Sequence, residues 1–557
     1  MCGFIFHKII NKRFNLDKKK FKEASKLIYH RGPDSKSYVY HKNQNIFHSR
    51  LKIIDLLDRS NQPMTRLGYT IIFNGEIYNY EKIKEELKKD FYFETNSDTE
   101  VLLFSFIKWK NKMFDKINGM YSFIIINNSK NLFFFARDLF GQKPLYYSKN
   151  IKQIIFSSEI KPLLKLNKFS KIKYDDKEIF KYLNFNYYGD DKFTFFKDIY
   201  QIRPGTFGYL RKNKLIFKKI KYKKYNYKIN EKNILKLLKK EIGDHLVSDV
   251  ETAIMISEGV DSKSIIDISK KIFYKNLKLF NLEFENFDNK EFRHKYLKNK
   301  RNLFFSKLFK HELFNYLSKA TAICETPPLS LFTLGMVKLF NKIKKKNIKV
   351  VLNGQGVDEI FGGYNMYYSK LDKNKTYHPD GSIFLDDKKI YKKKIKSHLN
   401  LNNIIVQRKN MAFKSKIPKN LNQIDKLSMN SSVECRSPYL TKNLAGLIDK
   451  LSLSHLHFKN HKKYIFRKSL YNLTKDKFYF NQKRFKQAPQ TEYMLDNKNL
   501  SKIKKIIKRK NYCDKYFNKK ILIKYFEGFK NSKNNGFVIW QYLSLNSFFN
   551  YFNKFNV

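Results

Sequence analysis

The second residue of the chain is a cysteine, and its position predicts a particular kind of nucleophile. If Met1 is removed, Cys2 becomes the first residue, and its α-amine then lies beside its own thiol. An α-amine has a pKa of about 8, so it can act as the base that activates the cysteine side chain. Most cysteines at position 2 have no such role, and the prediction therefore depends on the segments that follow.

Two segments in the second half of the chain have residue types typical of a nucleotide site. The first, Ser257 to Ser262 (SEGVDS), follows an apolar run and opens a helical pattern. Small residues and free backbone N–H groups at the start of a helix favour phosphate binding. The second, Asn353 to Tyr364 (NGQGVDEIFGGY), follows a strand pattern, and its glycines let the backbone approach a ligand closely. This is the strand end at which parallel α/β sheets bind nucleotides.

The elements that must position these residues differ between the two halves of the chain. In the first half, short apolar or alternating runs are separated by turn residues, which indicates a strand-rich domain with a few helices. The predicted elements are strands at 69–73, 121–126 and 132–136 and helices at 80–89 and 99–110. The pattern breaks near 201–205, and the strongly basic stretch 212–228 is typical of a connector.

In the second half, strands alternate with helices. The predicted elements are strands at 251–256, 277–284 and 350–352 and a helix at 263–271. Such alternation predicts a parallel sheet covered by helices.

Length and composition bound the protein class. The 557 residues are enough for two or three domains, and 42% hydrophobic residues exclude a mainly disordered chain. The longest apolar runs are far too short to span a membrane, and no apolar signal core follows the first basic residues. The four cysteines show neither disulfide nor zinc spacing, which suits a reducing compartment. We therefore expect a cytoplasmic protein without a membrane partner.

The net charge of +63 would by itself indicate a nucleic-acid partner. However, Lys, Asn, Ile, Phe and Tyr are enriched together, which is typical of AT-rich coding. The lysines are also spread along the whole chain, and no RNA-recognition, zinc-finger or basic-zipper pattern accompanies them. We expect no specific nucleic-acid partner, although a weak, salt-sensitive attraction to polyanions fits this charge.

Several motifs in the first 165 residues occur in a family-specific order behind Cys2. They are Arg31–Gly–Pro–Asp34, His48–Ser–Arg50–Leu51, Phe73 to Asn79 (FNGEIYN), Ser97–Asp98–Thr99–Glu100 and Ala136–Arg–Asp138. In this order and spacing the segment resembles the class II glutamine amidotransferases, whose glutaminase domain begins with Cys–Gly. The resemblance implies an α+β N-terminal-nucleophile fold, a four-layered αββα sandwich.

The same resemblance assigns roles to individual residues. It implies that Cys2 attacks the side-chain amide of glutamine, giving a thioester and ammonia. The side chain of Asn74 and the backbone N–H of Gly75 would form the oxyanion hole. For glutamine binding, it implies a bidentate contact of Arg50 with the α-carboxylate, contacts of Glu76 and Asp98 with the α-ammonium group, and a position for Ile53 in the same pocket.

The second half resembles a different enzyme module. Ser257 to Ser262 is similar to the Ser–Gly–Gly–x–Asp–Ser loop of ATP pyrophosphatases, and Leu427 to Pro438 is similar to a segment of the asparagine synthetases. Lys463 to Arg467 resembles the lysine-containing helix of that family, in which the lysine stabilises charge on the α-phosphate. The resemblance implies Mg²⁺ ligands at Asp261 and Asp358, and ATP contacts at Ile256, Ser257, Gly259, Asp261, Ser262, Leu282, Asn353 and Gly354.

Two positions depart from the family pattern. Glu258 stands where the pyrophosphate loop has its first glycine, and we expect its carboxylate to point outward or toward a cation. Gln355, retained as a catalytic candidate, stands where asparagine synthetases usually have a glutamate. A neutral amide cannot act as a general base, so Glu359 or the substrate itself would accept the proton, or the acceptor differs from aspartate.

The sequence therefore predicts two domains: a glutaminase over residues 1–200, a linker over 201–230 and an α/β ATP-pyrophosphatase domain over 231–557. The expected reaction activates an acceptor carboxylate with ATP as an acyl-adenylate, and ammonia formed at Cys2 then displaces AMP. Aspartate is the expected acceptor. The alternatives are another carboxylate, such as a uronic acid or an amino-sugar derivative, a glutaminase without synthetase activity, and a polyanion-binding protein on a decayed enzyme scaffold. A homodimer is compatible with the sequence.

Overall fold

The structure, a computed structural model, describes residues 2–555 apart from several gaps. The gaps are 12–16, 42, 131, 168–171, 187–190, 212, 223–227, 287–301, 369–403, 482–487 and 533–535. We call the described residues up to 222 the N-terminal half and those from 228 onward the C-terminal half.

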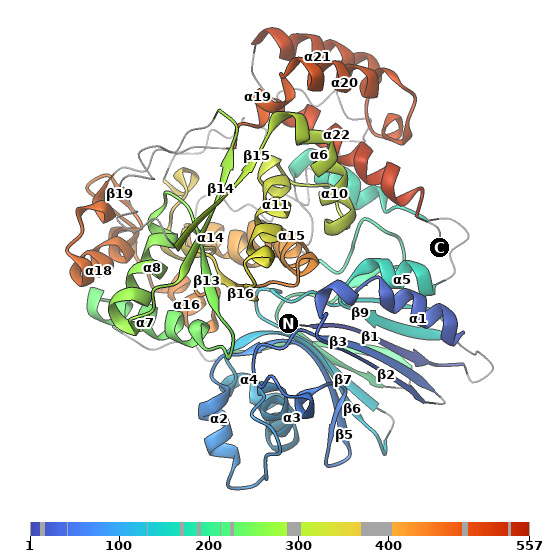
Figure 1. Cartoon of the computed structure of the whole chain (residues 1–557), viewed down its shortest axis with the longest axis vertical. Helices are drawn as coiled ribbons and strands as arrows, with labels where there is room; N and C mark the ends of the chain where they lie inside the picture. Colours follow the sequence, from blue (N-terminus) through green and yellow to red (C-terminus); the bar gives the residue numbers. More distant parts are fainter. Residues whose placement is uncertain are drawn as a thin grey trace.

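The N-terminal half contains two stacked six-stranded sheets (Figure 1). The first has the order β10 (Tyr200–Gln201), β8 (Tyr146–Lys149), β9 (Gln153–Ser157), β1 (Cys2–Ile9), β3 (Gln44–Arg50) and β2 (Ser35–His41). The second has the order β12 (Lys214–Lys219), β11 (Thr206–Arg211), β7 (Leu132–Arg137), β6 (Gly119–Asn127), β5 (Tyr69–Ile77) and β4 (Met64–Arg66). The neighbouring strands of both sheets pair antiparallel.

Helices cover the outer faces of both sheets. The helices α1 (Lys18–Lys26) and α5 (Ile160–Leu166) lie on the first sheet, and α2 (Tyr80–Leu87) and α3 (Asp98–Trp109) lie on the second (Figure 1). Alternation in β1 explains the stacking, because Phe4 and Phe6 enter the core between the sheets while Ile5 faces the outer helices. The predicted αββα sandwich is confirmed.

Part of the predicted linker belongs to this sandwich. The strand β11 pairs with β7, with Tyr209 opposite Phe134, and β12 pairs with β11. The prediction of a linker over 201–230 is therefore wrong for residues 206–211 and 214–219, whereas residues 212 and 223–227 lie outside the described residues. The basic residues that resembled a connector include Lys214, Lys218 and Lys219, which are exposed on the edge strand β12. Lysines on an edge strand remain solvated and hinder pairing with another chain.

The C-terminal half is built on a parallel sheet, as predicted. Its order is β15 (Leu303–Leu308), β14 (Lys278–Phe284), β13 (Thr252–Ile256), β16 (Val350–Leu352) and β17 (Glu434–Arg436). One face is covered by α7 (Glu231–Leu246), α8 (Val260–Phe273) and α18 (Tyr464–Thr474), and the other by α10 (Leu313–Cys324), α11 (Leu331–Lys345) and α15 (Lys416–Asn430) (Figure 1). The strand order reverses between β13 and β16, and sheets of this kind bind ligands at such a switch point.

The remaining helices and a small hairpin complete the two halves. They are α4 (Met113–Lys116), α6 (Asp176–Phe185), α12 (Val357–Phe361), α14 (Ile404–Phe413), α16 (Lys442–Ala445), α17 (Leu453–Leu456), α19 (Gln490–Met494), α20 (Asn497–Lys508), α21 (Lys519–Ser532), α22 (Gly536–Phe552) and the hairpin β18 (His457–Phe458) and β19 (His461–Lys462). Two of these helices, α4 and α6, belong to the N-terminal half. The helix α22 joins the two halves, because Gln541 Nε2 donates to the Tyr182 carbonyl at 3.0 Å.

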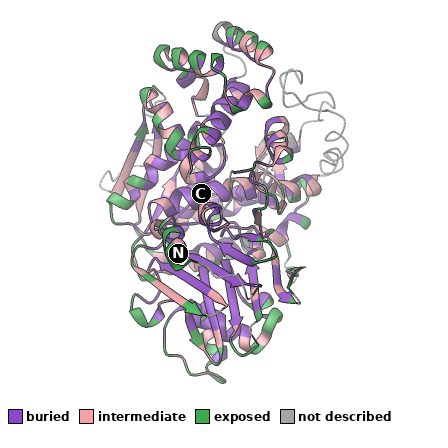
Figure 2. Cartoon of the chain, turned by 90° about the vertical axis from the view of Figure 1, so that its right-hand side faces the viewer, coloured by how far each residue is buried: buried purple, intermediate pink, exposed green. Residues whose placement is uncertain are grey.

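Burial follows this arrangement, with the buried residues concentrated in the sheets and the inner helices (Figure 2). Within the described ranges, no helix has the length and apolar character that a membrane span requires.

Two candidate active sites

The first candidate site lies where β1 begins, close to the junction of the two halves (Figure 1). The register of β1 and β3 places Cys2 opposite Arg50, and the Cys2 N–H donates to Asn74 Oδ1 at 3.2 Å across the sandwich. Cys2 is buried, and burial raises the pKa of its thiol despite the opposing charge of Arg50. Since a thiol with a raised pKa is mostly protonated, a nucleophile here needs a base beside it.

Asn74 and Gly75 have the donors that an oxyanion hole requires. Asn74 is fully buried on β5, and its Nδ2 group has no hydrogen-bond partner among the described residues. Buried donors without a partner are rare, and a ligand oxygen would satisfy this one. Gly75 is needed for a steric reason, because a Cβ there would lie 2.2 Å from the Met120 carbonyl oxygen.

Two carboxylates flank this pair. Asp98 begins α3, and its Oδ2 accepts a hydrogen bond from the Ile77 N–H at 2.9 Å. Burial raises the pKa of Asp98 to about 6. Glu76 follows Gly75 on β5, and burial together with the Asp98 charge raises its pKa well above the ordinary value. Glu76 Oε1 is buried without a hydrogen-bond partner in the described part of the chain. A substrate ammonium would stabilise both charged carboxylates.

The Arg50 guanidinium is held by the loop that follows it. Its Nη1 donates to the Leu57 carbonyl at 2.8 Å and to Asn61 Oδ1 at 3.1 Å, and its Nη2 donates to the carbonyls of Ile54 and Asp55. The predicted bidentate contact with a substrate carboxylate would compete with these bonds. The buried residue Ile53 belongs to the same loop, where its carbonyl accepts from the Asp249 N–H of the C-terminal half at 3.1 Å.

The sequence did not predict that the C-terminal half reaches this first site. Arg436 on β17 is fully buried, and its Nη2 donates to Glu76 Oε2 at 3.3 Å. Its other groups donate to Glu434 at 2.5 Å and to the carbonyls of His245 and Val247 at 2.8 and 2.6 Å. Arg436 belongs to the sequence motif at 427–438, but no sequence signal connects this motif to Glu76.

The second candidate site lies at the switch point of the parallel sheet. After β13, Ser262 Oγ accepts from the Ser257 N–H at 3.0 Å and thereby closes the loop, and α8 follows with Gly259 at its start. No side chain caps α8, so its first N–H groups are open to a phosphate. The Gly354 loop packs directly on this segment, since a Cβ at Gly354 would lie 3.0 Å from the Asp261 backbone.

Three predicted residues meet beside these loops. Lys463 Nζ lies 2.8 Å from each carboxylate oxygen of Asp261 and 2.5 Å from Asp358 Oδ1. The cluster needs Gly363, because a Cβ there would lie 1.7 Å from Asp358 Oδ1 and 2.4 Å from Lys463 Cε. Burial opposes the charge on Lys463, but the two aspartates outweigh it and raise the lysine pKa.

The donor set is compatible with Mg²⁺ but not with a metal site made by protein alone. The described residues contain no group of three or more His, Cys, Asp or Glu side chains that could hold a metal. Two carboxylates that share a site with nucleotide phosphates supply the oxygen ligands that Mg²⁺ prefers. Asp261 and Asp358 therefore fit Mg²⁺ only together with a bound phosphate group.

The other predicted ATP residues surround this cluster. Ile256 is the last residue of β13, Leu282 lies two residues before the end of the neighbouring strand β14, and Leu282 packs near Gly335 of α11. The Asn353 Oδ1 accepts from the Gln355 N–H at 2.9 Å and from Ser437 Oγ at 3.0 Å, so it shapes the turn that carries Gln355. Glu258 is half-buried.

Glu359 is a second carboxylate beside the aspartate–lysine cluster. Its Oε1 accepts from the Tyr364 hydroxyl at 2.6 Å. Burial and the adjacent Asp358 charge raise the pKa of Glu359 to about 7.

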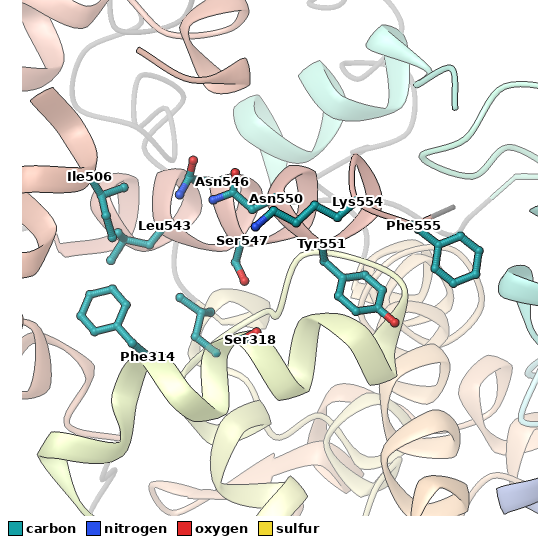
Figure 3. Close-up of a pocket in the computed structure, with 11 residues that line it drawn as sticks. Phe314, Ser318, Ile506, Leu543, Asn546, Ser547, Asn550, Tyr551, Lys554 and Phe555 are labelled. Atoms are coloured by element: carbon teal, nitrogen blue, oxygen red, sulfur yellow. The ribbon is translucent and has the colours of Figure 1, made fainter. Parts of the chain in front are cut away.

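A cavity of about 440 Å³ lies elsewhere, between α10, α20 and α22 (Figure 3). Its lining is mainly apolar and amide-bearing, with Lys554 at one end. None of the predicted site residues lines it, so it is separate from both candidate sites.

Comparisons with known proteins match each half of the chain to a different family. Residues 1–225 match the glutamine amidotransferase domain family, and residues 233–550 match the asparagine synthase family. Asparagine synthetase (glutamine-hydrolyzing) 1 of Bacillus subtilis is 33% identical over 67% of this chain and 60% of its own length. Asparagine synthetase (glutamine-hydrolyzing) 3 of the same organism is 29% identical over 66% of this chain and 64% of its own length.

A more distant relative has a different name: amidase chry2 of Gibberella zeae is 25% identical over 61% of this chain and 54% of its own length. The alignments thus span less than two thirds of each of these relatives. The asparagine synthase match nevertheless covers more than half of the chain. The chain therefore belongs to the asparagine synthase family.

Proposed function

We propose that this chain hydrolyses glutamine at Cys2 and uses the ammonia to amidate an ATP-activated carboxylate. The observation that carries the proposal is the presence of two distinct sites in one chain. One is a buried cysteine beside an amide donor that has no hydrogen-bond partner among the described residues, and the other is an aspartate–lysine cluster at the switch point of the parallel sheet. The contact of Arg436 with Glu76 connects the halves that carry them.

In the N-terminal half, loss of Met1 would expose the α-amine of Cys2. This amine takes the thiol proton, and the sulfur attacks the side-chain carbonyl carbon of glutamine. Negative charge then develops on the carbonyl oxygen, where Asn74 Nδ2 and the Gly75 N–H can donate to it. Collapse of the tetrahedral species releases ammonia, and water cleaves the remaining thioester to give glutamate.

In the C-terminal half, the start of α8 would bind the ATP phosphates. Asp261 and Asp358 would hold Mg²⁺, which neutralises charge on the leaving pyrophosphate when it is bound. Lys463, which contacts both aspartates in the structure, would stabilise negative charge on the α-phosphate. The acceptor carboxylate attacks the α-phosphorus and pyrophosphate leaves. Ammonia attacks the resulting acyl carbon and displaces AMP.

Aspartate is the proposed acceptor, with asparagine as the product, because two relatives are named asparagine synthetases. Gln355 favours a second candidate, because its amide cannot accept a proton as a glutamate would. This candidate is the same reaction on another carboxylate, such as a uronic acid or an amino-sugar derivative.

A pyrophosphate-release assay with ATP, ammonium and a panel of acids tests the proposal. The panel contains aspartate, glutamate, galacturonate and N-acetylmuramate, with a reaction lacking acid as the control. Release with aspartate alone supports asparagine synthesis, and release with a different acid alone overturns it in favour of the second candidate. Glutamine hydrolysis without release for any acid would indicate a glutaminase whose synthetase half is inactive.

The remaining partner and compartment predictions are part of this proposal. Four buried free cysteines suit a reducing cytoplasm. A homodimer stays a prediction, which light scattering of the purified protein can test.

Replacing Asn74 with alanine should lower kcat for glutamine hydrolysis by about 10²–10³-fold, because one oxyanion donor is lost. KM for glutamine should change little, since the donor acts mainly on the transition state. Glutamate formation measures both constants. The control is Asn61→Ala, which removes an acceptor of Arg50 and is expected to act mainly on KM. A loss confined to KM in Asn74→Ala would contradict the assigned role.

The pH profile of glutamine hydrolysis should reveal Asp98. The α-amine of Cys2 must be unprotonated, so kcat/KM falls tenfold per pH unit below its ordinary pKa of about 8. The pKa of Asp98 is about 6, and below that pH its neutral form cannot pair with the substrate ammonium. The profile should therefore steepen to about a hundredfold per unit below about pH 6. In Asp98→Asn the extra steepening should vanish, and an equally steep acid limb there would contradict the assignment.

A further inference from the structure

Two motifs of the N-terminal half have no role in the reaction proposed above: Arg31–Gly–Pro–Asp34 and Ala136–Arg–Asp138. Arg31 is fully buried, and its Nε donates to the carbonyl oxygen of Cys2 at 3.1 Å. Its Nη1 donates to Glu159 at 3.1 Å. The Arg31 guanidinium therefore fixes the main chain of the residue whose thiol and amine are both proposed to react.

The remaining end of Arg31 points into the other half of the protein. Arg31 Nη2 lies 2.9 Å from Asp425 Oδ2, and Asp425 is a buried residue of α15. Arg31 is thus clamped between Glu159 of its own half and Asp425 of the C-terminal half. Because the guanidinium is planar, two anchors at its ends determine where its Nε–H points.

The second motif leads to the same aspartate. The Asp138 carboxylate accepts from the N–H groups of Phe140, Gln142 and Lys143 and so shapes their loop. This loop presents the buried Lys143, whose Nζ lies 3.4 Å from Asp425 Oδ1. Asp425 therefore contacts one cation of the first motif and one cation of the loop that the second motif shapes.

The helix that carries Asp425 also lies close to the second candidate site. It begins at Lys416, whose ammonium group sits 3.6 Å from the ring centre of Tyr364, the residue bonded to Glu359. Asp425 follows Lys416 by nine positions, which corresponds to about 14 Å along the helix. The helix α15 thus contacts residues next to both candidate sites.

We infer that Asp425 is a positioning residue for Cys2: a carboxylate of the synthetase half that sets the orientation of the glutaminase nucleophile through Arg31. The inference rests on the proposed function of Cys2. Displacement of reacting groups by about 1 Å can cost about a hundredfold in rate, so release of one Arg31 anchor should be visible in kcat. Asp425 touches no substrate in this scheme, so KM for glutamine should change little.

A purely structural role for Asp425 would be to hold the halves together, and Glu325 offers the matched control. Glu325 is also a fully buried carboxylate of the C-terminal half, paired with Lys426 at 2.9 Å. It accepts from the Ile160 and Lys161 N–H groups of α5 at 2.8 and 2.7 Å. Its contacts across the junction therefore reach the backbone of α5, not Arg31.

The experiment compares Asp425→Asn, Asp425→Glu and Glu325→Gln in the full chain. For Asp425→Asn, kcat for glutamine hydrolysis should fall by about tenfold or more, with KM within about twofold of the wild type. The alkylation rate of the Cys2 thiol by iodoacetamide should change in the same variant. Asp425→Glu keeps the charge and should recover part of kcat. Glu325→Gln should keep kcat within about twofold while lowering the melting temperature.

For each variant, calorimetry measures the binding of ATP with Mg²⁺ and thereby shows whether the C-terminal half is folded. If Asp425→Asn does not fold, the double variant Asp425→Asn/Lys143→Met removes one anion and one cation together and should show the same loss of kcat. Wild-type kcat in a folded variant without Asp425 overturns the inference, as does an equal loss of kcat in Glu325→Gln. Absence of glutamine hydrolysis in the wild type would instead defeat the proposed function.

Discussion

Replacing Cys2 with alanine should lower glutamine hydrolysis by at least about 10³-fold, because no other group can form the thioester. Pyrophosphate release driven by added ammonium should stay near the wild-type rate, since the aspartate–lysine cluster lies in the other half. Glutamate formation measures the first activity, and pyrophosphate formed with ammonium chloride and the acid found in the acceptor panel measures the second.

Cys513→Ala is the matched control, because Cys513 is a fully buried cysteine in the C-terminal half and touches neither site. It should retain both activities. Residual glutamine hydrolysis in Cys2→Ala would mean that a different nucleophile reacts. Mass spectrometry of the active wild type should show that Met1 is absent, and a retained methionine would refute the α-amine as the base.

Replacing Asp358 with asparagine should have the second large effect, a loss of about 10²-fold or more in pyrophosphate release. The substitution removes one of the two carboxylates proposed to hold Mg²⁺, and it leaves Lys463 with Asp261 alone as its partner in this cluster. Glutamine hydrolysis should be unchanged, because Asp358 lies at the switch point of the parallel sheet. Both rates can be measured on one preparation.

The variant Asp449→Asn tests whether loss of any ion pair in the C-terminal half would lower pyrophosphate release. Asp449 pairs with Lys409 at a partly exposed position and is not one of the proposed site residues. Its variant should keep both activities. Simultaneous loss of pyrophosphate release and glutamine hydrolysis in Asp358→Asn would contradict two separate sites, whereas full pyrophosphate release would remove Asp358 from the metal-binding proposal.

Local patterns predicted the elements well, because their causes are local. The predicted strands at 69–73 and 121–126 lie within β5 and β6, and the predicted helix at 263–271 lies within α8. Side chains alternate along a strand and repeat every 3.6 residues along a helix, so the apolar spacing reveals which face is buried. The same reasoning failed at 214–219, where the edge strand β12 keeps its lysines in solvent and loses the apolar alternation.

The sequence also identified the candidate residues, but it did not show which groups hold their side chains. Motif order singled out Arg50, whereas only the structure shows that the loop carbonyls of Leu57 and Ile54 already bind its guanidinium. It likewise singled out Lys463, and the structure shows this lysine between Asp261 and Asp358. The order of motifs along a chain identifies candidate residues and their sequence neighbours. It contains no information on side-chain hydrogen bonds between separate loops.

By itself, the sequence determined the cysteine at position 2, the two segments proposed to bind phosphate, the sandwich and the parallel sheet, because each depends on short stretches of chain. Only the tertiary structure decided that Arg436 meets Glu76 and that Arg31 meets Asp425. Each of these pairs joins residues more than 350 positions apart. Such contacts form only when two completed halves dock, and the docking depends on the shapes of both surfaces at once.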